Sequence, residues 1–111
     1  MTKFLVLYNA TASAREQMAQ ATPEQAKAGM DAWMAWAQSA GEAIVDLGAP
    51  LQPSGRVTSS GMAESDTQAS GYSILQADSP QALAALLEGH PHLQMAGASI
   101  DILEALPIPG M

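Results

Sequence analysis

Apolar residues recur along the chain in patterns that predict four strands and two principal helices. Residues 3–8 (KFLVLY) carry apolar side chains on both alternating faces, which is typical of a strand covered on both sides. Shorter apolar runs at residues 43–49 (AIVDLGA) and 71–77 (GYSILQA) are bounded by turn-forming residues. A last strand is predicted over residues 98–106. We expect the first of these strands to lie in the centre of its sheet.

The longer helix is predicted to begin at Thr22, which opens a capping box with Pro23 at the first helical position and Gln25 at the third. Six apolar residues then recur on one face at helical spacing: Ala26, Met30, Trp33, Met34, Ala37 and Ala40. Gly41 is placed to end the helix. We expect this apolar face to cover the sheet.

The shorter helix has Ser79 as its predicted N-cap and Gly89 just past its end. Residues 51–70 form a polar stretch rich in serine, glycine, threonine and proline, within which residues 56–59 can pair as a short strand. The PIPGM tail, residues 107–111, is expected to lie on the surface as an extended arm.

The predicted order of strand, helix, strand, strand, helix, strand indicates an α+β fold. With two right-handed crossovers this order gives the ferredoxin-like βαββαβ unit, a four-stranded antiparallel sheet with both helices on one face. The other face would be bare, although Leu5, Leu7 and Leu103 place apolar side chains on the strands there. We therefore expect a homodimer in which two sheets pack against each other.

Length and charge restrict the class of protein. A chain of 111 residues is normally one domain, so we treat residues 1–111 as a single unit. With a formal net charge of −7, its cations are too few and too scattered to follow a nucleic acid backbone: Lys3, Arg15, Lys27 and Arg56. The acidity, the lack of an apolar run near roughly 20 residues and the lack of a basic signal-peptide start predict a cytoplasmic protein without a membrane partner.

Four segments resemble the YCII-related family, in its DGPF-like branch: KFLVLY, AGEAIVDLGAPL, SSGMAESDTQASGYSILQADS and SIDILEALPIPGM. Together with the helix after the third segment, the resemblance covers nearly the whole chain. It implies a single YCII-related domain, residues 1–111, with a ferredoxin-like subunit that dimerises as an α+β barrel. It also implies small-molecule chemistry, with a histidine–aspartate pair proposed as the active centre of the family.

The site residues of the family are matched only in part. Its helix histidine falls on Gln25, and its aspartate, in an Asp-Pro-aromatic step, falls on His90 in the His-Pro-His step of residues 90–92. The Asp-Gly-Pro-Phe motif of the branch falls on residues 59–62 (SSGM) and is absent, whereas the Gly-Tyr step at residues 71–72 fits. The fold expectation survives these departures, but the mechanism proposed for the family does not transfer intact.

His90 and His92 are the candidate acid–base residues, since Pro91 would hold His90 stiffly at the family's active position. The alternative is an ordinary helix ending, where an imidazolium meets the negative end of the helix dipole.

Asp46 interrupts an apolar strand on the face of Ile44, where a carboxylate is costly unless paired. If Asp46 met the N–H of His90, the pair would form a general base tuned near neutral pH. An edge position facing water, or a hydrogen bond to a loop amide, would also explain Asp46.

Other side chains are candidates for substrate binding. Trp33 and Met34 could line an apolar pocket for an aromatic molecule, although helical spacing predicts them equally as core. Tyr8 and Tyr72 could hydrogen-bond a substrate oxygen, and Arg56 could hold a carboxylate, or they are core-edge and solvated loop residues. Without cysteine, a nucleophile elbow, a phosphate loop or a convincing metal-ligand spacing, we expect no cofactor and no metal.

Two functions agree with these observations. The first is a cofactor-free lyase or isomerase in which His90 moves a proton on a small aromatic or cyclic organic molecule, oriented by Asp46. Tyr72 or Arg56 would then bind the oxygen of that molecule. The alternative is a non-catalytic dimeric module that binds small molecules or serves as an accessory subunit, which the loss of the helix histidine at Gln25 supports. The enzyme requires a cavity that His90 faces and an imidazole perturbed by a neighbour, whereas the module requires neither.

Overall fold

The computed structural model combines helices and strands; it describes residues 1–110 and leaves Met111 outside the described residues. These elements follow in the order β1 (Thr2–Asn9), α1 (Ala14–Gln20), α2 (Pro23–Ala40), η1 (Gly41–Ala43), β2 (Ile44–Pro50), β3 (Arg56–Thr58), β4 (Gly61–Ala63), β5 (Ala69–Ala77), α3 (Pro80–Leu87), η2 (Pro91–Gln94) and β6 (Ser99–Glu104). The elements η1 and η2 are short 3₁₀ helices. The fold is therefore α+β, as the sequence predicted.

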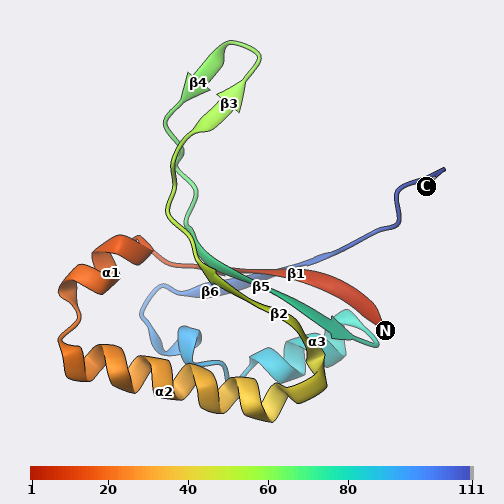
Figure 1. Cartoon of the computed structure of the whole chain (residues 1–111). Coiled ribbons are helices and arrows are strands. Elements are labelled where there is room, and N and C mark those ends of the chain that lie inside the picture. Colours follow the sequence, from red (N-terminus) through yellow and green to blue (C-terminus); the bar gives the residue numbers. More distant parts are fainter. Residues whose placement is uncertain (111) are drawn as a thin grey trace.

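The main sheet has four strands in the order β2-β5-β1-β6, and all neighbouring strands are antiparallel. β1 lies inside this sheet, which confirms the central position predicted from its two apolar faces. The register places Tyr8 opposite Gly71 of β5 and Phe4 opposite Glu104 of β6. Thus β5 begins beside the end of β1, and β6 ends beside its start (Figure 1).

The hydrophobic core lies between the main sheet and the helices α2 and α3, which both lie on one side of the sheet (Figure 1). Alternate residues of β1 point into it, so Phe4, Val6 and Tyr8 are buried while Leu5 is on the opposite, bare face. Strand β5 and the helices α2 and α3 complete the core with Trp36, Leu75, Ala77, Leu83 and Leu87. The alternation of β1 therefore decides which side chains reach the helices.

The helix boundaries follow the caps that the sequence predicted. Thr22 accepts a hydrogen bond from the backbone N–H of Gln25 at 3.1 Å, and Gln25 accepts one from the N–H of Thr22 at 3.0 Å. α2 ends at Ala40, and its C-cap is Gly41, whose φ of 55° is readily adopted by glycine. Ser79 caps α3. No helix in the described part of the chain is long and apolar enough to cross a membrane.

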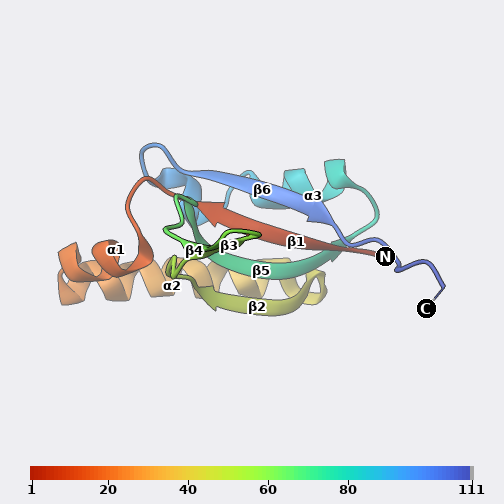
Figure 2. The same ribbon diagram turned by 90° about the horizontal axis from the view of Figure 1, so that it is seen from above.

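The predicted apolar face of α2 covers the sheet only along its C-terminal half. Trp33, Ala37 and Ala40 of this face are partly buried, whereas Met30 and Met34 are exposed. The buried Trp36 was not among the residues predicted for the face. The first half of the helix runs past the end of the sheet, beside α1 (Figures 1 and 2). The expectation that the whole face packs on the sheet was therefore wrong, because periodicity shows which residues share a face but not how far a sheet extends.

The polar stretch between β2 and β5 contains a hairpin rather than a single short strand. β3 and β4 pair with each other as a separate two-stranded sheet, so the predicted pairing near residues 56–59 is confirmed and has a local partner. The tail after β6 projects away from the sheet instead of lying on its surface (Figure 1). That part of the predicted arm was wrong for residues 107–110, and Met111 is outside the described residues.

Candidate functional site

His90 connects α3 to η2 and is held at both its backbone and its side chain. Its backbone N–H donates to the carbonyl of Leu87 at 3.0 Å, which continues the end of α3. Its side-chain Nδ1 accepts a hydrogen bond from the backbone N–H of His92 at 3.0 Å, so His90 is the N-cap of η2. Pro91 occupies the first position of η2, and its ring favours the extended backbone of His90, with φ −67° and ψ 136°.

The hydrogen bond to Nδ1 determines the tautomer of His90. An acceptor nitrogen carries no proton, so the proton of the neutral imidazole is on Nε2. Nε2 is buried and has no hydrogen-bond partner among the residues described. A buried donor without a partner has a desolvation cost, so this nitrogen is the least satisfied polar atom of the site.

Three aromatic rings enclose the imidazole of His90. Tyr8 stacks on it with ring centroids 4.9 Å apart, while Trp33 and Trp36 each meet it in a T-shaped arrangement at 4.4 Å. Only 1% of His90 is exposed. Contact with aromatic faces compensates a buried N–H weakly at most, since such contacts are worth less than a normal hydrogen bond. The ring is therefore part of the core between β1 and α2.

The surroundings of His90 disfavour its charged form. Burial, and to a smaller extent the nearby His92, together lower the pKa of the imidazole from the usual 6.5 to about 4. At neutral pH the ring is uncharged, so it makes no ionic interaction with the dipole of α3. The interpretation of His90 as an imidazolium at a helix end was therefore wrong; the residue is instead a neutral cap for the following turn.

His92 is also buried and is anchored to the sheet. Its Nε2 lies 2.8 Å from the carbonyl oxygen of Asn9, and because a carbonyl only accepts, Nε2 is the donor. The ring meets Tyr8 in a T-shaped arrangement at 5.4 Å. This bond ties η2 to the end of β1, 83 residues away in sequence. Both histidines thus join the segment after α3 to the core.

Tyr8 begins a hydrogen-bond chain within the core. Its phenol donates to Oγ of Ser73 at 2.8 Å, and Ser73 donates to the carbonyl of Leu47 at 2.6 Å. Burial raises the pKa of Tyr8, so the phenol stays protonated and a donor. Sequence reasoning missed Ser73, although its alternation with Leu75 in residues 71–77 was a usable signal for a polar group on the buried face.

Asp46 does not meet His90, so the predicted pair was wrong. Its carboxylate is exposed and accepts from the backbone N–H of Gly48 at 2.9 Å. Ile44 is opposite Leu75, but Asp46 is opposite Ile74, so β2 gains one residue at Val45 relative to β5. This bulge moves Asp46 from the face of Ile44 to the other face of an edge strand. The alternative of an edge position facing water is confirmed, whereas the amide that Asp46 accepts from belongs to β2 and not to a loop.

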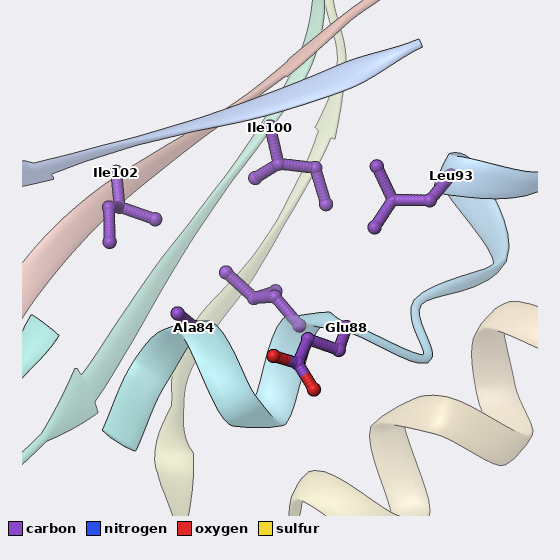
Figure 3. A pocket seen from close by; sticks show the side chains of 6 residues that line it. Ala84, Glu88, Leu93, Ile100 and Ile102 are labelled. Atoms are coloured by element: carbon purple, nitrogen blue, oxygen red, sulfur yellow. The ribbon is translucent and has the colours of Figure 1, made fainter. Parts of the chain in front are cut away.

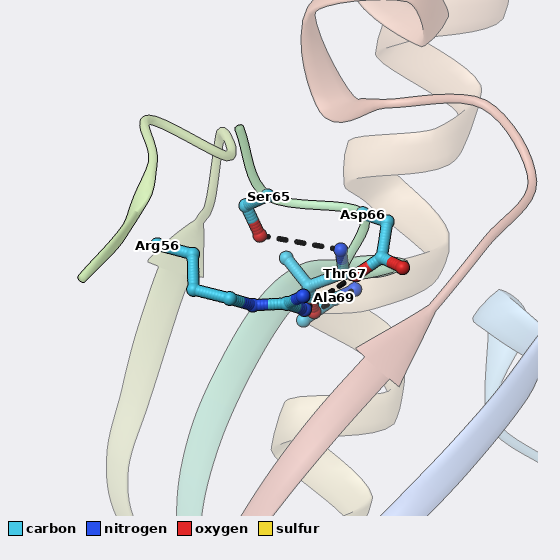
Figure 4. Close-up of polar contacts among 5 residues, drawn as sticks. All are labelled: Arg56, Ser65, Asp66, Thr67 and Ala69. Atoms are coloured by element: carbon cyan, nitrogen blue, oxygen red, sulfur yellow. Dashed lines mark hydrogen bonds and ion pairs between the residues drawn. The ribbon is translucent and has the colours of Figure 1, made fainter. Parts of the chain in front are cut away.

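The predicted binding residues do not converge on one site. Tyr8 and Trp33 touch His90, whereas Met34 is exposed on α2. Tyr72 is opposite Leu7 on the bare face of the sheet. Arg56 lies in the hairpin and pairs with Asp66, which the close-up of this region shows (Figure 4). The guanidinium of Arg56 holds the pKa of Asp66 below its usual value.

Two hollows in the described part of the chain are formed without His90. An apolar groove of about 190 Å³ lies between α3, η2 and β6, lined by Ala84, Leu87, Glu88, Leu93, Ile100 and Ile102 (Figure 3). A polar hollow of about 250 Å³ lies near the start of α1, lined by Ala10, Thr11, Ser13, Glu16, Pro53, Asp66, Thr67, Gln68 and Ala69. Within the described part of the chain, no three histidine, aspartate or glutamate side chains are grouped to hold a metal ion.

Comparison with known proteins adds no assignment. A scan against models of known protein families finds no match, and a search of curated proteins finds no significant relative. The geometry of the fold and of the His90 surroundings therefore carries the functional argument.

Proposed function

We propose that the chain is a ferredoxin-like subunit of the YCII-related type that forms a homodimer through the bare face of its sheet. The strand order β2-β5-β1-β6, with α2 and α3 on one side, supports the ferredoxin-like assignment, because it is the order that a βαββαβ chain with right-handed crossovers adopts. The cytoplasm remains our predicted compartment.

Cross-strand rows on the bare face support the dimer. Leu103, Leu5 and Ile74 lie opposite one another on three adjacent strands. In the next row Leu7 is opposite Tyr72 on β5 and Asp101 on β6, so the apolar part of the face lies in its middle strands. Apolar surface on an uncovered face favours burial against another apolar surface, and an identical face on a second copy provides one.

We further propose that this dimer is a non-catalytic module in which His90 maintains the fold. The observation that carries this proposal is that the imidazole is 1% exposed, while its Nδ1 accepts from the backbone N–H of His92. A general base must reach the proton that it removes, and a ring enclosed by Tyr8, Trp33 and Trp36 is shielded from solvent. Small-molecule binding by this module would then involve another surface, such as the apolar groove beside α3.

Chemical modification tests this proposal. Diethyl pyrocarbonate modifies accessible neutral imidazoles. Samples taken after short and long reaction times are digested with a protease, and fragmentation in the mass spectrometer shows how much of His90 and of His92 is modified. We expect His90 in the native protein to be modified at least tenfold more slowly than in the urea-unfolded chain. Rapid modification of native His90 would contradict the proposal.

The enzyme remains the second candidate because of one observation. Nε2 of His90 carries a proton and has no partner among the described residues, so it would gain a hydrogen bond if a substrate oxygen entered. A cofactor-free lyase or isomerase would need Trp33 to move in order to admit its substrate. The modification experiment distinguishes the two candidates, since such opening would expose His90.

A further inference from the structure

The β3–β4 hairpin presents an apolar pair to solvent. Val57 is directly opposite Met62 in the register, so the two side chains are on the same face of the hairpin. Val57 is 82% exposed and Met62 74% exposed, which are high values for residues of this kind. Each strand has only three residues. The hairpin therefore exposes apolar surface at the end of a long excursion from the sheet.

Such a hairpin needs a surface to pack on. An isolated two-stranded ribbon is at best marginally stable in water, and three-residue strands give few cross-strand contacts. The Arg56–Asp66 ion pair joins the two legs at the base, and the N–H of Leu51 donates to the carbonyl of Ser70 at 3.0 Å further down. These contacts orient the stem but leave the tip, with Val57 and Met62, uncovered.

The hairpin and the C-terminal arm (residues 105–110) project on the bare side of the sheet, from opposite ends (Figures 1 and 2). The hairpin leads into β5, which begins beside the end of β1, and the arm follows β6, which ends beside the start of β1. The arm exposes Leu106 and Ile108. Two apolar projections thus bracket the face that we propose as the dimer interface.

The size of the sheet face shows why these projections matter. Four strands spaced about 4.8 Å apart and about 26 Å long present roughly 500 Å² in projection. A standard stable interface buries about 800 Å² on each partner. The hairpin and the arm would supply the remaining area if a second copy lay between them.

We infer that the hairpin is a docking arm for a second copy of this chain, which it contacts through Val57 and Met62. The inference rests on the proposed homodimer and adds how the partner is held: the sheets stack, and each hairpin packs its apolar pair on the other subunit. By two-fold symmetry the same contact forms twice, so a single substitution removes two contacts per dimer.

Sedimentation equilibrium of the full chain tests this inference. We expect Val57→Ser combined with Met62→Ser to raise the dimer Kd at least tenfold. The Kd of the single variant Met62→Ser should lie between those of the wild type and the double variant. Met30→Ser is the matched control, because Met30 is 61% exposed but lies on α2, on the other side of the sheet. We expect it to change the Kd less than twofold. All three positions are exposed, so the variants should fold.

The outcomes separate the inference from the proposal beneath it. A wild-type dimer whose Kd is unchanged in the hairpin variant would overturn the docking arm and leave the sheet-to-sheet dimer standing. A monomeric wild-type chain would overturn both. Hydrogen exchange gives a second readout: amides of residues 56–63 should become at least tenfold more protected as concentration rises through the Kd, and unchanged protection would contradict the docking arm.

Discussion

The backbone N–H of His92 donates to Nδ1 of His90 across 3.0 Å, so one histidine caps the turn that carries the other. This bond requires Nδ1 to be unprotonated, and the burial that lowers the pKa of His90 to about 4 keeps it so at neutral pH. Capping and burial therefore both favour the neutral form of the imidazole. They explain the His-Pro-His step as a structural connection between α3 and the core.

Acidification should destabilise the protein through His90. Its pKa of about 4 in the folded chain is below the usual 6.5, so between these pH values the unfolded chain binds a proton more readily. The stability that depends on the neutral ring is complete above pH 6.5 and is lost as the pH falls toward 4. We expect this residue to contribute a drop of about 2–3 kcal/mol in the free energy of unfolding between pH 7 and pH 4.

Urea denaturation of His90→Asn provides the control for that pH dependence. Asparagine retains a side-chain acceptor for the N–H of His92 but cannot titrate. The variant should be less stable than the wild type at pH 7, and the stability difference should shrink as the pH falls to 4. An equal acid-dependent loss in both proteins would show that His90 is not responsible.

Gly48 should tolerate no side chain. It has a φ of 84°, and a Cβ there would lie 1.7 Å from the carbonyl oxygen of Tyr72. We expect Gly48→Ala to lower the free energy of unfolding by about 2–4 kcal/mol. Gly29→Ala is the matched control within α2, where an added Cβ meets nothing within 4 Å. It should stabilise the protein by about 0.5–1 kcal/mol, and a similar loss in both variants would contradict the prediction.

The Tyr8–Ser73 bond should be visible in a double-mutant cycle. Ser73→Ala removes the acceptor of the Tyr8 phenol and the donor to the Leu47 carbonyl, and we expect a cost of about 2 kcal/mol. Tyr8→Phe leaves the bond from Ser73 to Leu47 intact and should cost about 1 kcal/mol. In urea denaturation the double variant should lose less free energy of unfolding than the two single variants lose together, since both substitutions remove the same hydrogen bond. Strict additivity would contradict the coupling.

The sequence predicted those parts of the fold that depend on local chemistry. The capping box at Thr22 and the apolar faces of residues 3–8 are readable because a cap involves neighbouring residues and a strand has a fixed alternation. The sequence also predicted strand pairing near residue 57, but it did not predict that the side chains there are exposed. Local patterns give the elements, whereas their surroundings depend on the rest of the chain.

The structure brings some of the candidate site residues together, but it does not form the predicted pair of His90 and Asp46. His90 was singled out, but its enclosure by Tyr8, Trp33 and Trp36 depends on how η2 packs against α2. The face of Asp46 was inferred from strict alternation, which the extra residue at Val45 breaks. A bulge is a property of strand pairing, so one strand read alone does not reveal it.

An NMR titration of the two imidazoles, in the wild type and in Asp46→Asn, tests the central claim most directly. We predict that His90 remains the neutral Nε2–H tautomer from pH 8 down to about pH 4 and that its titration is the same in Asp46→Asn. A His90 that titrates near 6.5, or that moves when Asp46 is changed, would contradict the account and favour an acid–base pair.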